Sequence, residues 1–253
     1  MKLIGQKTQM IVDEPDHEIL RLFSAPLYKT HIGINNDEKE ILMGEKKWVG
    51  QEDNILIQSE SDQILNLDGI ERIKNEINKH IKKYIKSIIS PLEDDTEFII
   101  TQSWLNIIND GFHHKHRHQN SIISGAFYVN TTMKDFIEFD SPLAPFWDML
   151  SVSSKELNEF NSVNYREFVH SGQLVIFPSY LTHGVPGRFK TKGIKSQPRC
   201  SLAFNTFPVG RLGGSHEQHP GVNTKKIIEE RLTIKLGAQH QRNEVKIDSS
   251  KSS

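Results

Sequence analysis

The residues best suited to chemistry are histidines. Four of the twelve in the chain fall within six residues, at His113, His114, His116 and His118. His116 and His118 are two positions apart, so on an extended segment both rings project to the same side, about 6 to 7 Å apart, and could bind one metal ion. Spacing alone does not establish a site, because GFHHKHRHQN can equally be an exposed basic loop with solvated rings.

Further candidates lie far along the chain. His183 follows the apolar run GQLVIFPSYLT, a position from which its ring can face back into a barrel. Arg199 and Ser201 come next and share one face of an expected strand by the period of two. A guanidinium group beside a hydroxyl inside a barrel can bind a carboxylate. These residues together predict a metal site with a carboxylate pocket beside it.

Strands must hold most of these residues. Short apolar runs rich in β-branched and aromatic residues, separated by loops, predict a sandwich or barrel of mostly antiparallel strands. The runs cover residues 97–108, 121–130, 135–139, 172–177 and 199–207.

Flanking segments complete this picture. Isoleucines recurring every three or four residues predict an amphipathic helix from Asp68, as N-cap, to the stop signal Pro91. Residues 20–35 predict an irregular strand near a sheet edge, and residues 224–236 a short helix before a frayed tail. The interruption from Asp140 to Phe168 is long for a compact domain, which is typical of a functional or mobile loop.

Several motifs follow one another along the chain, and they are WLN at 104–106, HxHxxS at 116–121, SGAFYV at 124–129, GQLVIFPSYLTHGV at 172–185 and RCSLAFN at 199–205. Together they resemble the 2-oxoglutarate and Fe(II)-dependent oxygenases of phage and marine bacterial type, and the similarity spans residues 20–208. It implies a mainly β fold with flanking helices, a cupin-like double-stranded β-helix or jelly roll. Fe(II), the co-substrate 2-oxoglutarate and O2 are the implied reactants.

This resemblance also divides the chain. Residues 1–92 are expected to form an N-terminal strand and supporting helix packed on the barrel. Residues 93–210 would be the double-stranded β-helix core, and residues 211–253 a C-terminal helix and flexible tail.

Metal-binding roles follow from the resemblance with one difficulty. His116 and His183 match the two histidine ligands, but the position of the expected carboxylate holds His118. Three alternatives stay open: His118 is itself a ligand, Asp140 supplies the carboxylate, or water fills the position. We favour His118, because HxH preserves the local geometry.

Roles toward 2-oxoglutarate are implied in the same way. Arg199, also a catalytic residue by this resemblance, maps onto the residue that binds the far carboxylate, with Ser201 as support. Asn106 and Tyr128 are expected either to hydrogen-bond 2-oxoglutarate or to be buried polar residues satisfied by backbone. His113 and His114 are expected at the entrance and Trp104 in the core.

The function so implied is oxygenation, with hydroxylation of an unknown substrate and release of succinate and CO2. Two alternatives remain: a cupin-like three-His metalloenzyme that does not use 2-oxoglutarate, and a non-catalytic jelly-roll binding module. The Arg199-x-Ser201 pair argues against the first.

Composition limits the remaining classes. With 31 basic and 32 acidic residues the net charge is −1, so there is no strong nucleic-acid signal. No apolar run approaches the roughly 18 residues of a membrane span, and no signal-peptide core is seen, so we expect a cytoplasmic protein. Cys200 is the single cysteine, which excludes an intrachain disulfide and a thiolate zinc site.

Expectations about the substrate rest on the loops. Loop cations could attract an anionic substrate, and they are Lys115, Arg117, Arg188, Lys190, Lys192 and Lys195. The insert 141–168 is expected to cover the site, with Phe146, Trp147 and Tyr165 packing on substrate. Edge strands of a jelly roll often pair between two molecules, so a homodimer remains an alternative to a monomer.

Overall fold

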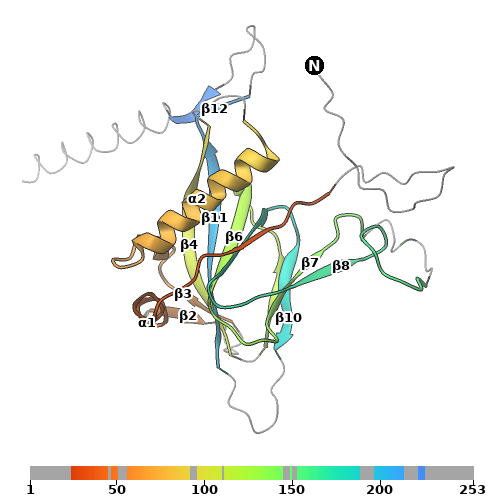
Figure 1. Ribbon diagram of the computed structural model, residues 1–253, viewed down its shortest axis with the longest axis horizontal. Helices are drawn as coiled ribbons and strands as arrows, with labels where there is room; N and C mark the ends of the chain where they lie inside the picture. The colour runs from red at the N-terminus through yellow and green to blue at the C-terminus, as the bar shows by residue number, and fades with distance from the viewer. Residues whose placement is uncertain are drawn as a thin grey trace, which may run out of the picture.

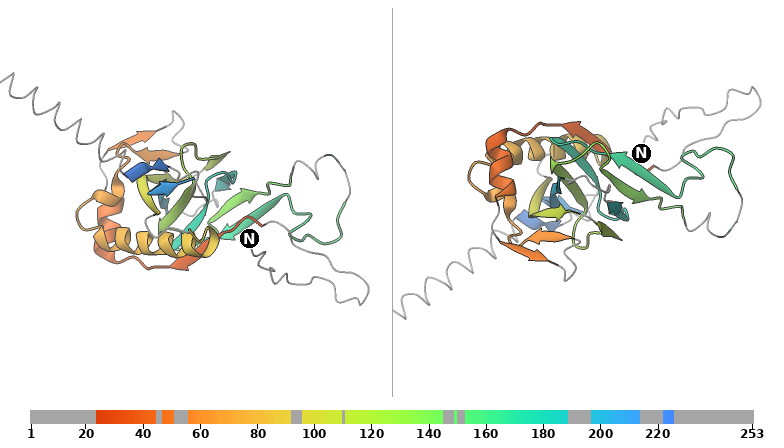
Figure 2. Two further views of the ribbon diagram at one scale, coloured as in Figure 1. Left: turned by 90° about the horizontal axis from the view of Figure 1, so that it is seen from above. Right: turned by 90° about the horizontal axis from the view of Figure 1, so that it is seen from below.

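Two antiparallel β-sheets face each other, and helices cover the outer face of the larger sheet (Figures 1 and 2). The computed structural model describes residues 24–44, 47–50, 56–91, 96–109, 111–144, 149, 153–188, 197–213 and 222–225. The predicted mainly β jelly roll with flanking helices is thereby confirmed. The finer division at residues 92 and 210 stays a prediction.

The larger sheet has the order β1-β9-β6-β11-β4-β3-β2. Its strands are β1 (Tyr28–His31), β9 (Gln173–Pro178), β6 (Ile123–Asn130), β11 (Arg199–Val209), β4 (Glu97–Ile108), β3 (Ile57–Ser59) and β2 (Trp48–Gly50). The edge position of β1 agrees with the strand expected within residues 20–35.

The smaller sheet has the order β5-β10-β7-β8. Its strands are β5 (Gly111–His116), β10 (His183–Arg188), β7 (Phe136–Asp140) and β8 (Asn164–Phe168). A separate pair is formed by β12 (Arg211–Leu212) and β13 (Val222–Asn223). The sequence runs predicted β4, β6, β7, β9 and β11. They missed β5 and β10, because GFHHKH and HGVPGR lack apolar alternation.

The helices of the described residues pack on one side of the larger sheet. The first, α1 (Asn36–Met43), begins at a capping box formed by Asn35 and Glu38. A 3-10 turn, η1 (Ile64–Asn66), leads to the long helix α2 (Glu71–Ile88). The predicted N-cap Asp68 is wrong: the N-cap is Ile70, because Gly69 with φ +85° turns the chain between them.

The larger sheet is buried on both faces. Alternate residues of β6 and β11 point in opposite directions. Phe127 and Leu202 belong to the core under the helices, which includes Ile73, Ile77 and Ile81 of α2. Tyr128 belongs to the second core, between the sheets. Side chains that point into this second core, between the two sheets, are therefore the ones that can form an interior site.

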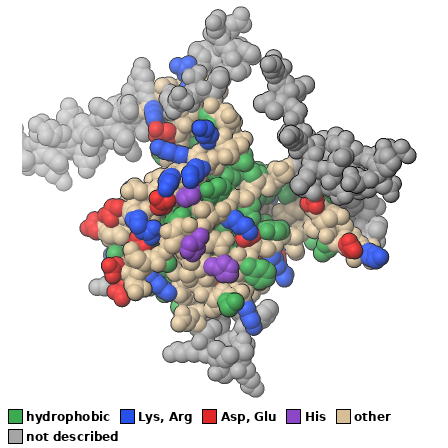
Figure 3. Space-filling model, viewed as in Figure 1, with side chains coloured by type: hydrophobic (Ala, Val, Ile, Leu, Met, Phe, Trp, Pro, Cys, Tyr) green, Lys and Arg blue, Asp and Glu red, His purple; other side chains and the backbone are tan. Residues whose placement is uncertain are grey.

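The outer surface over the helices is mixed in charge. Figure 3 shows basic and acidic side chains interspersed on this face. Lys82 and Lys83 of α2 are exposed, as expected for a solvated helix face, and Lys79 pairs with Glu76 at 3.0 Å. Within the described ranges, no helix is both long and apolar enough to cross a membrane.

Some expectations fall outside the described residues. These are Phe146, Trp147, the cations Lys190, Lys192 and Lys195, and the helix expected at 224–236 beyond residue 225. The interruption 140–168 is not wholly a loop, because its last five residues form β8 along the edge of the smaller sheet.

Candidate metal centre

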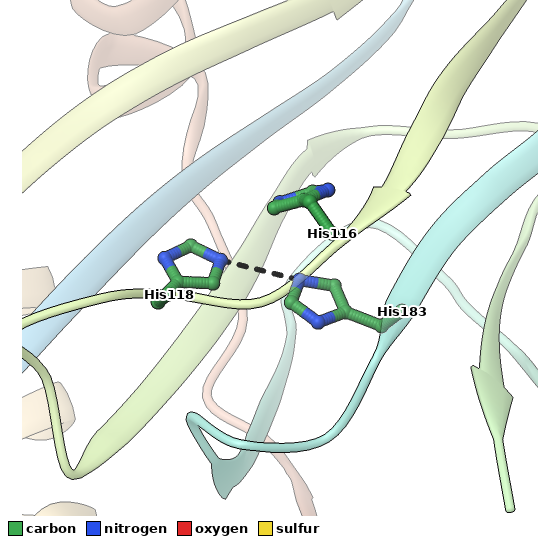
Figure 4. A group of neighbouring side chains, drawn as sticks. All are labelled: His116, His118 and His183. Atoms are coloured by element: carbon green, nitrogen blue, oxygen red, sulfur yellow. Dashed lines mark hydrogen bonds between the residues drawn. The ribbon is translucent and has the colours of Figure 1, made fainter.

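Three histidines meet at one end of the smaller sheet (Figure 4). His116 is the last residue of β5 and His183 the first residue of β10, and they are register partners. His118 follows two residues after β5 ends. Among the described residues, these three are the group able to hold a metal ion, with ligand atoms all within 4.8 Å of one another.

The spacing of two ring nitrogens suits shared coordination. The Nε2 atoms of His118 and His183 lie 3.2 Å apart, and their rings are nearly parallel at 8°. Two nitrogens each about 2.1 Å from one ion and at a right angle would lie about 3.0 Å apart. The observed distance is therefore close to that of neighbouring ligands on a single ion.

Backbone carbonyls orient two of the rings. His116 donates from Nδ1 to the carbonyl oxygen of His114 at 2.7 Å. His183 donates from Nδ1 to the carbonyl oxygen of Leu181 at 2.9 Å. Because Nδ1 then carries the proton, Nε2 keeps its lone pair for a metal.

Burial keeps two of the rings neutral. Desolvation lowers the pKa of His183 to about 3, against a smaller opposing effect of the Leu181 carbonyl. Desolvation also lowers the pKa of His118 to about 4, with the neighbouring His116 acting in the same direction. Neutral imidazole is the form that binds a metal, so both rings are ready for one at neutral pH.

A β-bulge in β5 places His113 and His114 in different environments. The register of β5 and β10 shifts between the pairs His183–His116 and Val185–His113, which leaves one extra residue on β5. His113 consequently stacks on His116 at 4.4 Å and lines the site cavity. His114, the other expected entrance residue, is exposed, its ring centre lies 4.6 Å from that of Phe112, and it does not line the cavity.

The residues expected to bind 2-oxoglutarate lie in the same cavity. Ser201 of β11 is registered against Asn106 of β4 on one side and Tyr128 of β6 on the other. Arg199 lies two residues before Ser201 on the same face, with its guanidinium carbon 5.3 Å from the centre of the Tyr128 ring. The β-strand period thus places all four predicted residues beside the three histidines.

Several polar groups of this cavity have no partner. Among the described residues, the buried side-chain atoms without a hydrogen bond are Nε and Nη1 of Arg199, the hydroxyl of Tyr128 and Nε1 of Trp104. Leaving such a group unsatisfied costs about 1–3 kcal/mol, so a cluster of them indicates a ligand. Trp104 was expected in the core, but it is half-buried and lines the cavity.

Asn106 differs from these groups. Its Oδ1 accepts a hydrogen bond from Gln58 at 2.8 Å, so the side chain is held by β3. Its remaining amide N–H groups are the part that a ligand in the cavity could use.

Asp140, one of the alternatives for the third ligand, is engaged elsewhere. Its carboxylate pairs with Lys115, which also contacts Glu138 at 3.0 Å. Burial tends to raise the pKa of Glu138, but hydrogen bonds from Arg166 and Lys115 outweigh it, so the pKa is lowered. The loop cation Lys115 is therefore bound to carboxylates rather than free to attract a substrate.

Two hollows differ in size and content. The site cavity has a free volume of about 40 Å³. A wider surface hollow of about 550 Å³ lies between β1 and β8. It contains Tyr165, whose hydroxyl donates to Glu167 at 2.8 Å, and Tyr165 does not line the site cavity. A contact of Tyr165 with substrate stays a prediction.

The core sequence matches a known family. Residues 102–205, which include all the cavity residues named above, match the family described as "Putative 2OG-Fe(II) oxygenase". No curated protein matches the chain. The phage and marine bacterial type of the family stays a prediction.

Three solved structures are similar to this chain at low sequence identity. The epimerase SnoN, in complex with Fe3+, alpha ketoglutarate and nogalamycin RO, is similar at 8% identity and a TM-score of 0.50, covering 79% of this chain and 90% of that one. HygX from Streptomyces hygroscopicus, with nickel and 2-oxoglutarate bound, has 9% identity and a TM-score of 0.49, covering 79% and 91%. A Pseudomonas putida prolyl-4-hydroxylase has 13% identity and a TM-score of 0.45, covering 72% and 93%.

Proposed function

We propose that the protein is an Fe(II)- and 2-oxoglutarate-dependent oxygenase that hydroxylates a substrate yet to be identified, on the premise that residues 102–205 match the family described as "Putative 2OG-Fe(II) oxygenase". The observation that carries the proposal is the joint presence, in one cavity, of a three-histidine group and unpartnered buried donors. Each half of this arrangement fits one of the two bound components that such an oxygenase needs.

Fe(II) fits the three histidines. Imidazole nitrogen is a common iron ligand, and three ligands on one side leave positions for other molecules. His116 and His183 lie where sequence reasoning expected ligands, and His118 completes the group where the wider superfamily has a carboxylate. A site of three neutral ligands keeps the full charge of the ion, which favours binding of an anionic co-substrate.

2-Oxoglutarate fits the unpartnered donors. A carboxylate accepts hydrogen bonds in a plane, which suits the guanidinium group of Arg199. The hydroxyls of Tyr128 and Ser201 lie on the neighbouring strands at the same level of the sheet. Bound 2-oxoglutarate would therefore satisfy donors that are otherwise buried without partners.

The residues of the chain would bind 2-oxoglutarate, orient it and exclude water. Bound iron with 2-oxoglutarate and O2 would supply the oxidising chemistry, with succinate and CO2 as products. Arg199, Tyr128 and Ser201 would fix the far carboxylate and so orient the keto acid toward the histidines. Phe177 and Ile137 line the cavity with apolar surface, which restricts water around the reacting groups.

Ligand binding and turnover test the proposal separately. The purified protein is loaded with Fe(II) without oxygen, titrated with 2-oxoglutarate, and followed by the visible charge-transfer band of the metal with the keto acid. Oxygen is then admitted, and succinate is measured without added substrate. We expect a band and slow succinate formation.

Two other outcomes would contradict the proposal. Metal binding without the band would favour a cupin-like three-His enzyme that does not use 2-oxoglutarate. A band with no succinate and no turnover of any substrate tried would favour a binding module. The variant H114A serves as a matched control, because this neighbouring histidine is exposed and outside the cavity.

A further inference from the structure

Lys115 precedes the cavity residue His116 but points away from the cavity. Its neighbour His116 faces the cavity, whereas the Lys115 ammonium group reaches Glu138 and Asp140 of β7. In the smaller sheet, β5 and β7 are not neighbours, because β10 lies between them. The lysine therefore bridges the two strands that flank β10.

The backbone of β5 approaches Gly184 closely at this point. Gly184 is paired with Glu138 across the sheet, and it follows His183 in β10. A Cβ atom on Gly184 would lie 2.8 Å from the carbonyl oxygen of His113 and 3.1 Å from Cα of Lys115. Only a residue without a side chain lets the bulged β5 lie so close, and the lysine then spans β10 at this position.

The carboxylate that receives the lysine is itself fixed. The Glu138 side chain is only 4% exposed, and its second oxygen accepts from Arg166 of β8 at 2.7 Å. A carboxylate so removed from water and held by two cations is a far more rigid anchor than an exposed ion pair. Phe139, the next residue of β7, is the register partner of His183 on the other side.

We propose that Lys115 is a positioning residue of the metal centre, which ties the end of β5 to β7 across Gly184 and so fixes His116 opposite His183. The inference rests on the proposed function for the identity of the ligands. Without the lysine bridge, β5 would be held to β10 at its end by an irregular ladder alone. His116 would then sample positions too far from His183 to share an ion, and metal affinity would fall.

The test measures metal affinity apart from turnover. Co(II) is titrated into the metal-free protein, and its visible absorption gives both the dissociation constant and the ligand geometry. K115M removes the charge at nearly constant length, and we expect the dissociation constant to rise about tenfold or more, as for other residues that orient metal ligands. K115R keeps the cation and should restore the affinity to within about threefold of wild type.

A second ion pair provides the matched control. Lys29 pairs with Glu167 at 2.9 Å, and their side chains are 58% and 7% exposed. This pair resembles that of Lys115 and Glu138, whose side chains are 40% and 4% exposed. Lys29 lies outside the site cavity. K29M should therefore leave the Co(II) affinity and spectrum unchanged, even if it lowers the melting temperature of the metal-free protein.

The outcomes separate positioning from stability. A K115M protein that melts lower but binds Co(II) within twofold of wild type would overturn the proposal. Should K115M fold poorly, K115Q, which keeps a polar end group, is measured in the same way. A separate result would contradict the oxygenase proposal: wild-type protein would bind Co(II) but show no charge-transfer band when Fe(II) and 2-oxoglutarate are added.

Discussion

His116, the last residue of β5, and His183, the first residue of β10, are direct partners in the antiparallel register of the smaller sheet. Facing residues in such a pair have Cβ atoms about 4.5–5.5 Å apart, which brings rings far apart in sequence into one site. Their ring centres are 4.5 Å apart. Strand pairing thus positions two of the three histidines of the candidate metal site, and only His118 depends on the irregular segment after β5.

The identity of the third ligand is tested by substitution at His118. H118A removes one of three ligands and should weaken Co(II) binding by about 10- to 100-fold or more. H118D restores a carboxylate at the superfamily's usual position and should bind Co(II) more tightly than H118A, with a changed visible spectrum. If H118A bound as tightly as wild type, a water or another residue would complete the site instead.

The carboxylate pocket is tested at Arg199 and Tyr128. R199M leaves the space filled but removes the donors, so the dissociation constant of 2-oxoglutarate should rise about 10- to 100-fold, within the range for charged hydrogen bonds. Y128F removes one hydroxyl and should raise it about three- to tenfold. Both are measured by titrating the Fe(II) protein with 2-oxoglutarate.

Co(II) affinity is the control for these two variants. Neither side chain belongs to the three-histidine group, so Co(II) should bind as in wild type. A parallel loss of Co(II) binding would mean that the cavity had collapsed, and the result would then speak against a specific role for Arg199.

The Trp104 side chain has a buried N–H donor whose role can be tested by substitution. Its ring lies 5.7 Å from that of His118, and its buried N–H group has no partner among the described residues. W104F keeps an aromatic ring but no N–H, so we expect the dissociation constant of 2-oxoglutarate to rise about three- to tenfold, the worth of one hydrogen bond. An unchanged value would assign Trp104 to packing alone.

Most residues of the candidate site could be predicted from the sequence because they follow the strand period. Arg199 and Ser201 share a face of β11, and Asn106 and Tyr128 share the level of Ser201 on the adjacent strands. Apolar runs rich in β-branched and aromatic residues made these strands predictable, and an error of one residue in register would have turned each side chain toward the helices.

The features that the sequence did not predict depend on a local irregularity in a strand or on a contact between residues far apart in the sequence. The bulge in β5 separates His113 from His114, and nothing in GFHHKH marks where an extra residue enters. The engagement of Asp140 depends on Lys115, twenty-five residues earlier, reaching over Gly184. Such a contact exists only once the strand order is known, so no spacing rule predicts it.

The helix core contributes to stability rather than to the site. Ile77 of α2 is fully buried in the cluster between the helix and the larger sheet. I77A should lower the free energy of unfolding by about 2–5 kcal/mol, through lost burial and a remaining cavity. Urea denaturation measures the change, and K82A on the exposed side of the same helix should change it by less than about 0.5 kcal/mol.

Stability at low pH should depend on Glu38. Its side chain is 4% exposed and accepts two hydrogen bonds from Arg72, each 2.6 Å long. These bonds, the largest effect, hold the pKa of Glu38 below its ordinary value of 4.5. The unfolded chain therefore takes up a proton at a higher pH than the folded protein does. The stabilising contribution is complete above about pH 4.5 and is lost as pH falls through the lower, folded pKa.

Comparison of wild type with E38Q isolates this contribution. Urea denaturation should show E38Q less stable by about 1–3 kcal/mol at pH 7, and the difference should shrink steadily as pH falls below about 4.5. E76Q, which breaks the exposed pair with Lys79, is the control, since water and salt screen that pair. A difference between wild type and E38Q that stayed constant down to pH 3 would show that the Glu38 carboxylate contributes through packing rather than through its charge.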